Sequence, residues 1–165
     1  MRGLLERREY AMLVLSLAAK ACGGVLKSKL RLVKLFFLVQ KEAKDVVEKL
    51  VGSPEPYSFE PYLHGPFSRE LLEDVEKLAE LGLVHIDDEI IAKNFIRKNY
   101  VLTSKGVEVF AEIEKRVPRE LLEKLKKLVE RYAKMDLDDL LNYVYSRYPE
   151  DSTPLPGRGK IGYSP

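Results

Sequence analysis

Three groups of side chains in this sequence have the types and spacing to bind a partner, and the first group is basic. Lys93, Arg97 and Lys98 surround the turn of a predicted β-ribbon. Lysine and arginine neutralise phosphates, and each contact makes binding to nucleic acid more sensitive to salt. These three residues are therefore DNA-contact candidates. The alternative is a solvated face of ion pairs, which a chain rich in charge often carries.

The second group is aromatic and surrounds a histidine next to a Gly-Pro turn. One interpretation is a pocket that binds a peptide of a protein partner, with the histidine as its polar handle. The other is a turn that packs on the core, because Gly-Pro demands a special backbone geometry. The partner-binding pocket candidates are Tyr57, Phe59, Tyr62, His64 and Phe67.

The third group is a run of tyrosines near the end of the last predicted helix, namely Tyr143, Tyr145 and Tyr148. Tyrosine is enriched at protein interfaces because it buries area and keeps a polar tip. These residues are therefore self-association candidates, and a homodimer is one possibility. Alternatively, the rings cover the core of their own chain.

The inventory of reactive side chains predicts no enzyme, no metal and no cofactor. A single cysteine, Cys22, permits no internal disulfide, and only His64 and His85 could supply imidazole ligands. A zinc site would then need mostly carboxylates, which is unusual. The sequence contains no P-loop, dinucleotide fingerprint or nucleophile elbow. We therefore interpret the chain as a non-enzymatic module.

The composition of the 165 residues fits one globular domain of a thermophilic or archaeal protein. Lys and Arg number 28 and Asp and Glu 26, whereas Asn and Gln together number four, a balance typical of proteins that work at high temperature. No apolar run is long enough to span a membrane. Arg7 and Arg8 before an apolar run imitate a secretory signal, but Glu9 and Lys20 interrupt that pattern. We expect a core helix there and a cytoplasmic protein with no membrane partner.

Hydrophobic periodicity and caps predict six helices and one ribbon. We expect Cys22 to be buried with Leu13 and Leu17 at the end of the first helix. Residues 87–89 should interrupt the ribbon, and its tip should be polar because it projects into water. Pro61 and Pro66 permit only short strands around them. The predicted helices cover residues 6–21, 28–49 with a break near 44, 68–81, 105–116, 119–134 and 137–147, and the ribbon strands cover 83–86 and 100–102.

The order of three helices followed by a ribbon predicts a mostly α (α+β) fold with a winged-helix-like domain, a two-stranded β-ribbon and additional C-terminal helices. The alternative is an unrelated α+β domain with one hairpin. We expect the winged-helix-like domain over residues 1–116, a helical extension packed on it over 117–147, and a tail rich in proline and glycine over 148–165.

Two segments resemble SocA-like antitoxins, also called Panacea-domain proteins, and their uncharacterised winged-helix relatives. The helical segment 32–38, Leu-Val-Lys-Leu-Phe-Phe-Leu, resembles the leucine-lysine-leucine helix of that family. Residues 57–68 resemble its tyrosine-glycine-proline turn, although His64 stands where tyrosine is usual, and the family's C-terminal histidine and tryptophan signature has no counterpart. The resemblance covers about residues 29–106. It implies a regulatory module that neutralises or delivers a protein partner.

Charge argues against DNA readout by the third helix, which usually lies in the major groove. Residues 68–81 carry Arg69 and Lys77 against five acidic side chains, a net charge of −3 that phosphates would repel. Residues 26–49 carry a net +4, from seven basic and three acidic side chains. We therefore favour a protein partner bound in an antitoxin-like manner. The alternative is a transcription regulator that contacts DNA weakly through its wing.

Overall fold

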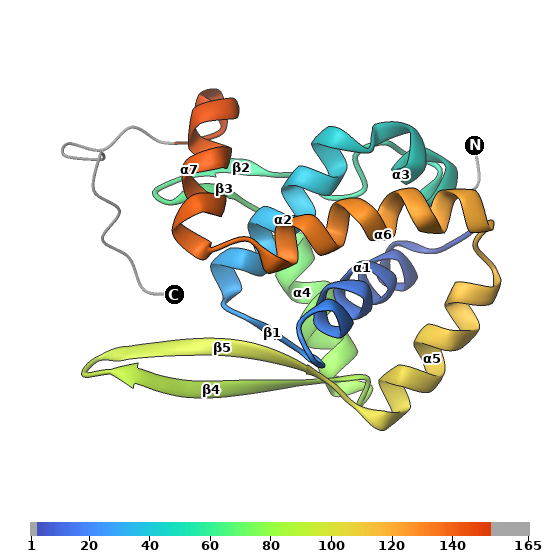
Figure 1. Ribbon diagram of the computed structural model, residues 1–165, viewed down its shortest axis with the longest axis horizontal. Helices are drawn as coiled ribbons and strands as arrows, with labels where there is room; N and C mark the ends of the chain where they lie inside the picture. Colours follow the sequence, from blue (N-terminus) through green and yellow to red (C-terminus); the bar gives the residue numbers. More distant parts are fainter. Residues whose placement is uncertain (1–2, 153–165) are drawn as a thin grey trace.

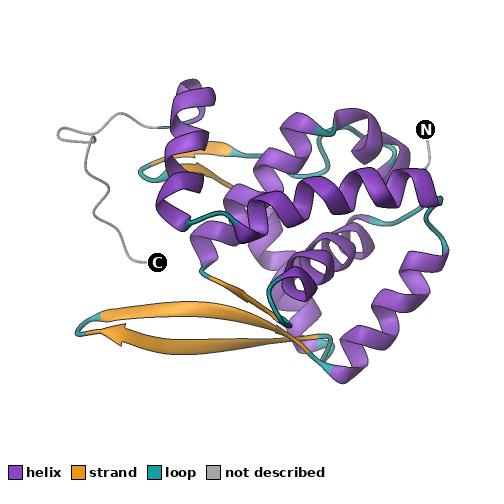
Figure 2. Ribbon diagram, in the orientation of Figure 1, coloured by secondary structure: helices purple, strands orange, loops and turns teal. Residues whose placement is uncertain are grey.

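The computed structural model describes residues 3–152, which are mostly helical with a small antiparallel sheet of three strands and a second sheet of two. Helices form the body, and one long ribbon projects from it (Figures 1 and 2). In chain order the elements are α1 (Arg7–Ala21), β1 (Val25–Lys27), α2 (Lys29–Glu42), α3 (Lys44–Val51), β2 (Glu60–Tyr62), β3 (Gly65–Phe67), α4 (Arg69–Glu80), β4 (Val84–Ala92), β5 (Phe95–Leu102), α5 (Ser104–Lys115), α6 (Arg119–Lys134), α7 (Leu137–Arg147) and the 3-10 turn η1 (Pro149–Asp151).

Helix α1 is the central helix of the body. Residues 10–19 are all buried, because α4, α5 and α6 pack around them (Figure 1). The prediction that Cys22 is buried beside Leu13 and Leu17 was wrong, since Cys22 is exposed. The helix ends at Ala21, and the C-cap residue Cys22 turns out of the core, where its thiol donates a hydrogen bond of 3.5 Å to the Ala133 carbonyl.

Helices α2 and α3 form the predicted broken helix. The Ser28 side chain caps α2 by accepting a hydrogen bond from the Arg31 amide, as expected from its residue type. The break lies at Ala43, within one residue of the predicted position. Residues 32–40 of α2 are all buried, which agrees with an apolar pattern on more than one face.

Strands β4 and β5 form the ribbon, which we call the wing. The predicted pairing of 83–86 with 100–102 is confirmed, with Ile86 opposite Tyr100. The prediction that residues 87–89 break the strand was wrong, because β4 continues through them to Ala92. Each acid from Asp88 onward faces a base on β5, so the pairing compensates the charges. Strand β1 pairs with the base of β5 and gives the sheet order β1-β5-β4.

Two glycines and a threonine fix the base of the wing. Gly82 has a φ of +79° and ends α4 in the left-handed conformation that glycine adopts without strain. The Thr103 hydroxyl donates to the Gly82 and Leu83 carbonyls and accepts from the Gly106 amide at 2.9 Å, so it caps α5. A Cβ on Gly106 would lie 2.1 Å from the Leu83 carbonyl oxygen, so this contact requires glycine.

Helices α6 and α7 match the predicted ranges 119–134 and 137–147 and cover the other side of the body. Helix α6 packs on α1 and α2, and α7 packs on α2 and β3. Of the predicted tail, residues 148–152 lie against the body and Ser152 forms a parallel bridge with Tyr62, whereas residues 153–165 lie outside the described range. Between residues 3 and 152, no helix combines the length and the apolar character that a membrane span requires.

Candidate functional site

The basic side chains of the wing are largely engaged in cross-strand ion pairs. Arg97 Nη2 lies 2.7 Å from Glu89 Oε1, and Lys98 Nζ lies 2.9 Å from Asp88 Oδ1. The Arg97 and Asn99 hydrogen bonds lower the pKa of the Glu89 carboxyl below its ordinary value and favour its charged form. Of the three DNA-contact candidates, only Lys93 stands fully exposed at the turn without an ion pair among the described residues.

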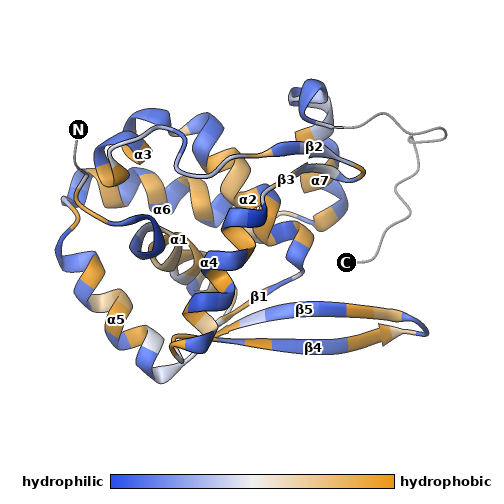
Figure 3. Cartoon of the chain, turned by 180° about the vertical axis from the view of Figure 1, so that it is seen from behind, coloured by the Kyte–Doolittle hydropathy of each residue, from blue (hydrophilic) through white to orange (hydrophobic). Residues whose placement is uncertain are grey.

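The turn at the end of the wing is polar as predicted, since Lys93 and Asn94 form it, but the strand ends beside it carry exposed apolar side chains that were not expected. Ile90 is 80% exposed and Ile96, which pairs with it across the ribbon, is 55% exposed. Ile91 and Phe95 complete the group, which we call the apolar wing tip, and Figure 3 shows its hydrophobic colour on the strand ends just before the hydrophilic turn. Among residues 3–152, ten large hydrophobic side chains are exposed, and six of them lie on the wing or on the β2–β3 hairpin. Such clustering is typical of an interaction site.

A groove of about 410 Å³ separates the wing from the β2–β3 hairpin and the start of α2. We call it the wing groove. Its walls combine lysines with aliphatic and aromatic side chains, and Ile96 makes it continuous with the apolar wing tip. The residues that line it are Lys29, Leu30, Lys34, Tyr62, His64, Phe67, Asp88, Ile96 and Lys98.

A buried lysine of α2 holds the β2–β3 hairpin, which forms one wall of this groove, in position. Pro61 and Pro66 face each other across the hairpin, where neither can donate a backbone hydrogen bond, and each strand is only three residues long as predicted. Lys34, which is 2% exposed, donates to the Pro66 carbonyl at 3.0 Å. The hairpin therefore depends on side chains of α2 for its position.

The structure divides the five aromatic pocket candidates into two groups. Tyr57 is buried in the core beside Tyr10 and Phe36, and Phe59 packs on Phe37 with ring centroids 5.4 Å apart. Tyr62, His64 and Phe67 line the wing groove, and the rings of Tyr62 and Phe67 lie 5.3 Å apart.

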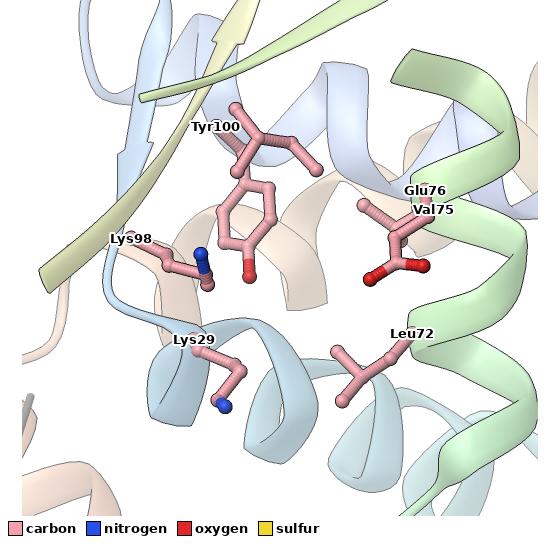
Figure 4. Close-up of a pocket in the computed structure, with 7 residues that line it drawn as sticks. Lys29, Leu72, Val75, Glu76, Lys98 and Tyr100 are labelled. Carbon is pink, nitrogen blue, oxygen red and sulfur yellow. The ribbon is translucent and has the colours of Figure 1, made fainter. Parts of the chain in front are cut away.

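A smaller hollow of about 110 Å³ continues from the wing groove toward α4 (Figure 4). Lys29 and Lys98 line both spaces. Glu76 of α4 stands on the opposite wall, and the Tyr100 ring reaches in from β5 (Figure 4). Burial and the nearby carboxylates of Glu76 and Asp88 raise the pKa of Tyr100 above its ordinary value.

Two of the three self-association candidates are bound within their own chain. The hydroxyls of Tyr143 and Tyr148 donate to Glu42 Oε2 at 2.8 and 2.9 Å, and that of Tyr132 donates to Glu42 Oε1. Burial, together with the Glu42 carboxylate, raises the pKa values of Tyr132 and Tyr148. Tyr145 is 39% exposed.

An ion cluster around the buried Asp74 carboxylate, on the other side of the body, ties α1 to α4. Asp74, which is 4% exposed, accepts hydrogen bonds from Arg7 Nε at 2.8 Å and from the Tyr57 hydroxyl at 2.7 Å. Arg8 Nε lies 3.5 Å from the same carboxylate. The charge of Asp74 is balanced by these partners, so we interpret the cluster as structural.

Sequence reasoning missed Lys29, Ile90 and Ile96 as surface candidates and Glu42 and Asp74 as anchors. The signal for the isoleucines was present, since apolar pairs flank the Lys93-Asn94 turn in strand alternation. Nothing local marks Glu42 or Asp74, because their partners lie far away along the chain. Among residues 3–152, no cluster of three or more His, Cys, Asp or Glu side chains is arranged to hold a metal ion.

Comparison with known proteins returns no relative on which to draw. No protein-family model, no curated protein and no solved structure matches the chain. The function therefore has to be inferred from the surface itself.

The ion pairs of the wing predict weak DNA binding with a shallow salt dependence. Three phosphate contacts would give a slope of about −3 in log affinity against log salt, whereas Lys93 alone gives about −1. Because Arg97 and Lys98 already face carboxylates, we expect a slope near −1 in a fluorescence-anisotropy titration on several duplexes. The variant Arg97→Ala/Lys98→Ala should hardly change it. Nanomolar, sequence-selective binding that is lost when Arg69 is replaced would contradict this expectation.

Proposed function

We propose that the chain is a winged helix with an inserted segment. Helix α1, strand β1, helices α2 and α4, and the β4–β5 ribbon follow the helix-strand-helix-helix-ribbon order of that fold. The sheet order β1-β5-β4, with the first strand beside the last, supports this interpretation. Helix α3 and the β2–β3 hairpin are then an insertion between the second and third helices, and the insertion forms one wall of the wing groove.

The function that the surface supports best is that of a non-enzymatic regulatory module that binds a protein partner in an antitoxin-like manner. One observation carries the proposal, namely the apolar wing tip. Four exposed aliphatic and aromatic side chains at the end of a ribbon are unfavourable in water and make no bond to a phosphate. A protein partner that covers them removes this area from water, whereas they offer no charge to a phosphate backbone.

The wing tip can be tested with a photocrosslinking side chain at Phe95, which is 43% exposed. We expect p-benzoylphenylalanine at position 95 to form one discrete protein adduct in cells of the source organism, which mass spectrometry then identifies. The matched control has the same residue at Val107 on α5, which is exposed to a similar degree, 46%. It should form no adduct.

The identified partner then permits a quantitative test with purified proteins. The variant Ile90→Lys/Ile96→Lys places two charges on the apolar wing tip and should weaken the complex at least tenfold, whereas Val107→Lys should leave it unchanged. Both sites are surface positions, so thermal unfolding should match that of the parent chain. Adducts to nucleic acid at position 95, or the same adducts from both positions, would refute the proposal.

A further inference from the structure

The wing groove differs from the apolar wing tip in that it is charged. Three lysines line it, Lys29, Lys34 and Lys98, against the single carboxylate of Asp88. Lys34 is 2% exposed and already donates to the Pro66 carbonyl, so the positive charge that faces the groove belongs to Lys29 and Lys98. Lys98 Nζ is 2.9 Å from Asp88 Oδ1, so that pair is locally neutral and the excess positive charge comes from α2.

The start of α2 adds to this positive potential. Lys29 is the first residue of the helix, and no acidic residue occupies the first turn. The amino end of a helix carries a partial positive charge, which acidic side chains in the first turn commonly offset. Here that charge lies beside the exposed Lys29, which lines both the wing groove and the hollow toward α4 (Figure 4).

The remaining walls of the groove are apolar or aromatic. Leu30, Tyr62, Phe67 and Ile96 provide them, and Ile96 also belongs to the apolar wing tip. A free phosphate or a nucleic-acid backbone would leave the apolar walls of the groove exposed to water. A segment that carries both carboxylates and large apolar side chains pairs with Lys29 and buries the walls at once.

On the basis of the proposed function, we propose that the wing groove binds a segment of the protein partner that is acidic and apolar. Its carboxylates lie beside Lys29 and the amino end of α2, and its apolar side chains lie between Phe67 and Ile96. The apolar wing tip then covers the part of the partner that follows this segment. The groove thus determines which segment is accepted, because a basic segment would face like charge.

Selection from a random peptide display library on the immobilised protein tests this assignment. We expect the enriched peptides to combine Asp or Glu with Leu, Ile or Phe. In fluorescence-anisotropy titrations, a selected peptide should bind at least tenfold more tightly than its copy with Lys for each acid. It should also bind at least tenfold more tightly than its copy with Ser for each large apolar residue. No enrichment, or enrichment without a charge preference, would overturn the inference.

Surface variants then locate the binding. Lys29→Glu and Ile96→Ser, both at exposed positions, should each lower the affinity for the selected peptide at least tenfold. Lys126→Glu on α6 makes the same charge change away from the groove and should leave the affinity unchanged. Loss of affinity in Lys126→Glu as well, or displacement of the peptide by a single-stranded oligonucleotide at lower concentration, would also overturn the inference.

The inference about the wing groove and the proposed function of the apolar wing tip can be refuted separately. A partner that still crosslinks at position 95 and keeps its affinity in Lys29→Glu would remove the groove inference and leave the proposed function intact. Absence of a protein adduct at position 95 in the parent chain would instead refute the proposed function.

Discussion

Replacing Asp74 by asparagine is expected to lower the free energy of unfolding by about 2 kcal/mol. The Asp74 carboxylate is buried and accepts hydrogen bonds from Arg7 and Tyr57, with Arg8 close by. Asparagine preserves the shape but removes the charge, which leaves two arginines beside a neutral amide in a partly buried site. Urea unfolding monitored by circular dichroism measures the change.

The neighbouring residue Glu73 provides a matched control for this prediction. It is exposed on the same helix, and Glu73→Gln makes the same chemical change. Surface substitutions of this kind usually change stability by less than about 0.5 kcal/mol. If Asp74→Asn also costs less than about 1 kcal/mol, then solvent rather than Asp74 balances the arginines, and the cluster does not hold α1 against α4.

Replacing Glu42 by glutamine is expected to lower the free energy of unfolding by about 2 kcal/mol. Three tyrosine hydroxyls, from Tyr132, Tyr143 and Tyr148, donate to this carboxylate. A glutamine side chain has one acceptor oxygen and a donor amide, so it cannot accept all three bonds with charge assistance. Because two of these tyrosines follow α6, the loss should loosen the C-terminal helices from α2.

Tyrosine ionisation provides a second measurement that a general loss of stability would not reproduce. Burial and the Glu42 carboxylate raise the pKa values of Tyr132 and Tyr148, so removal of the negative charge should move both downward. Absorbance titration of the folded variant measures this shift. Glu48→Gln, at an exposed site on α3, is the control and should alter neither quantity. Unchanged tyrosine titration in Glu42→Gln would contradict the prediction.

The helices could be predicted from the sequence because their signals are local. Thr103, Asp136 and Ser68 each cap the helix that follows, and the predicted ranges 119–134 and 137–147 match α6 and α7. The broken helix of α2 and α3 was also predictable, because the apolar pattern changes there. Each of these features depends on residues within one or two helical turns of one another.

The strands were harder to predict because their pairing is distant. Strand β1 has three residues and pairs with β5 about 75 positions later, so no local pattern marks it. Asp87, Asp88 and Glu89 have low strand propensity, and the bases that compensate Asp88 and Glu89 lie on the opposite strand. The error over residues 87–89 followed from judging one strand without its partner.

The candidate site was predictable only in parts. Lys98, Tyr62, His64 and Phe67 were identified from two separate motifs, and the fold brings them to one groove. Tyr57 was assigned to the same pocket but lies in the core, because the sequence does not show which rings of a turn face inward. Lys29 was missed because a lysine at the start of a helix is common in sequences. Only the fold shows that the wing lies beside it.

The three-residue pairing of β1 with β5 makes the wing a lever with a fixed base. Strand β1 is bonded to β5 only at residues 99–101, and the buried Tyr100 ring anchors that point in the core. Beyond it, the ribbon has two strands, and within residues 3–152 no third strand pairs with it. A small rotation at the base is therefore magnified at Ile90 and Ile96, so the wing can open or narrow the groove without any change of register.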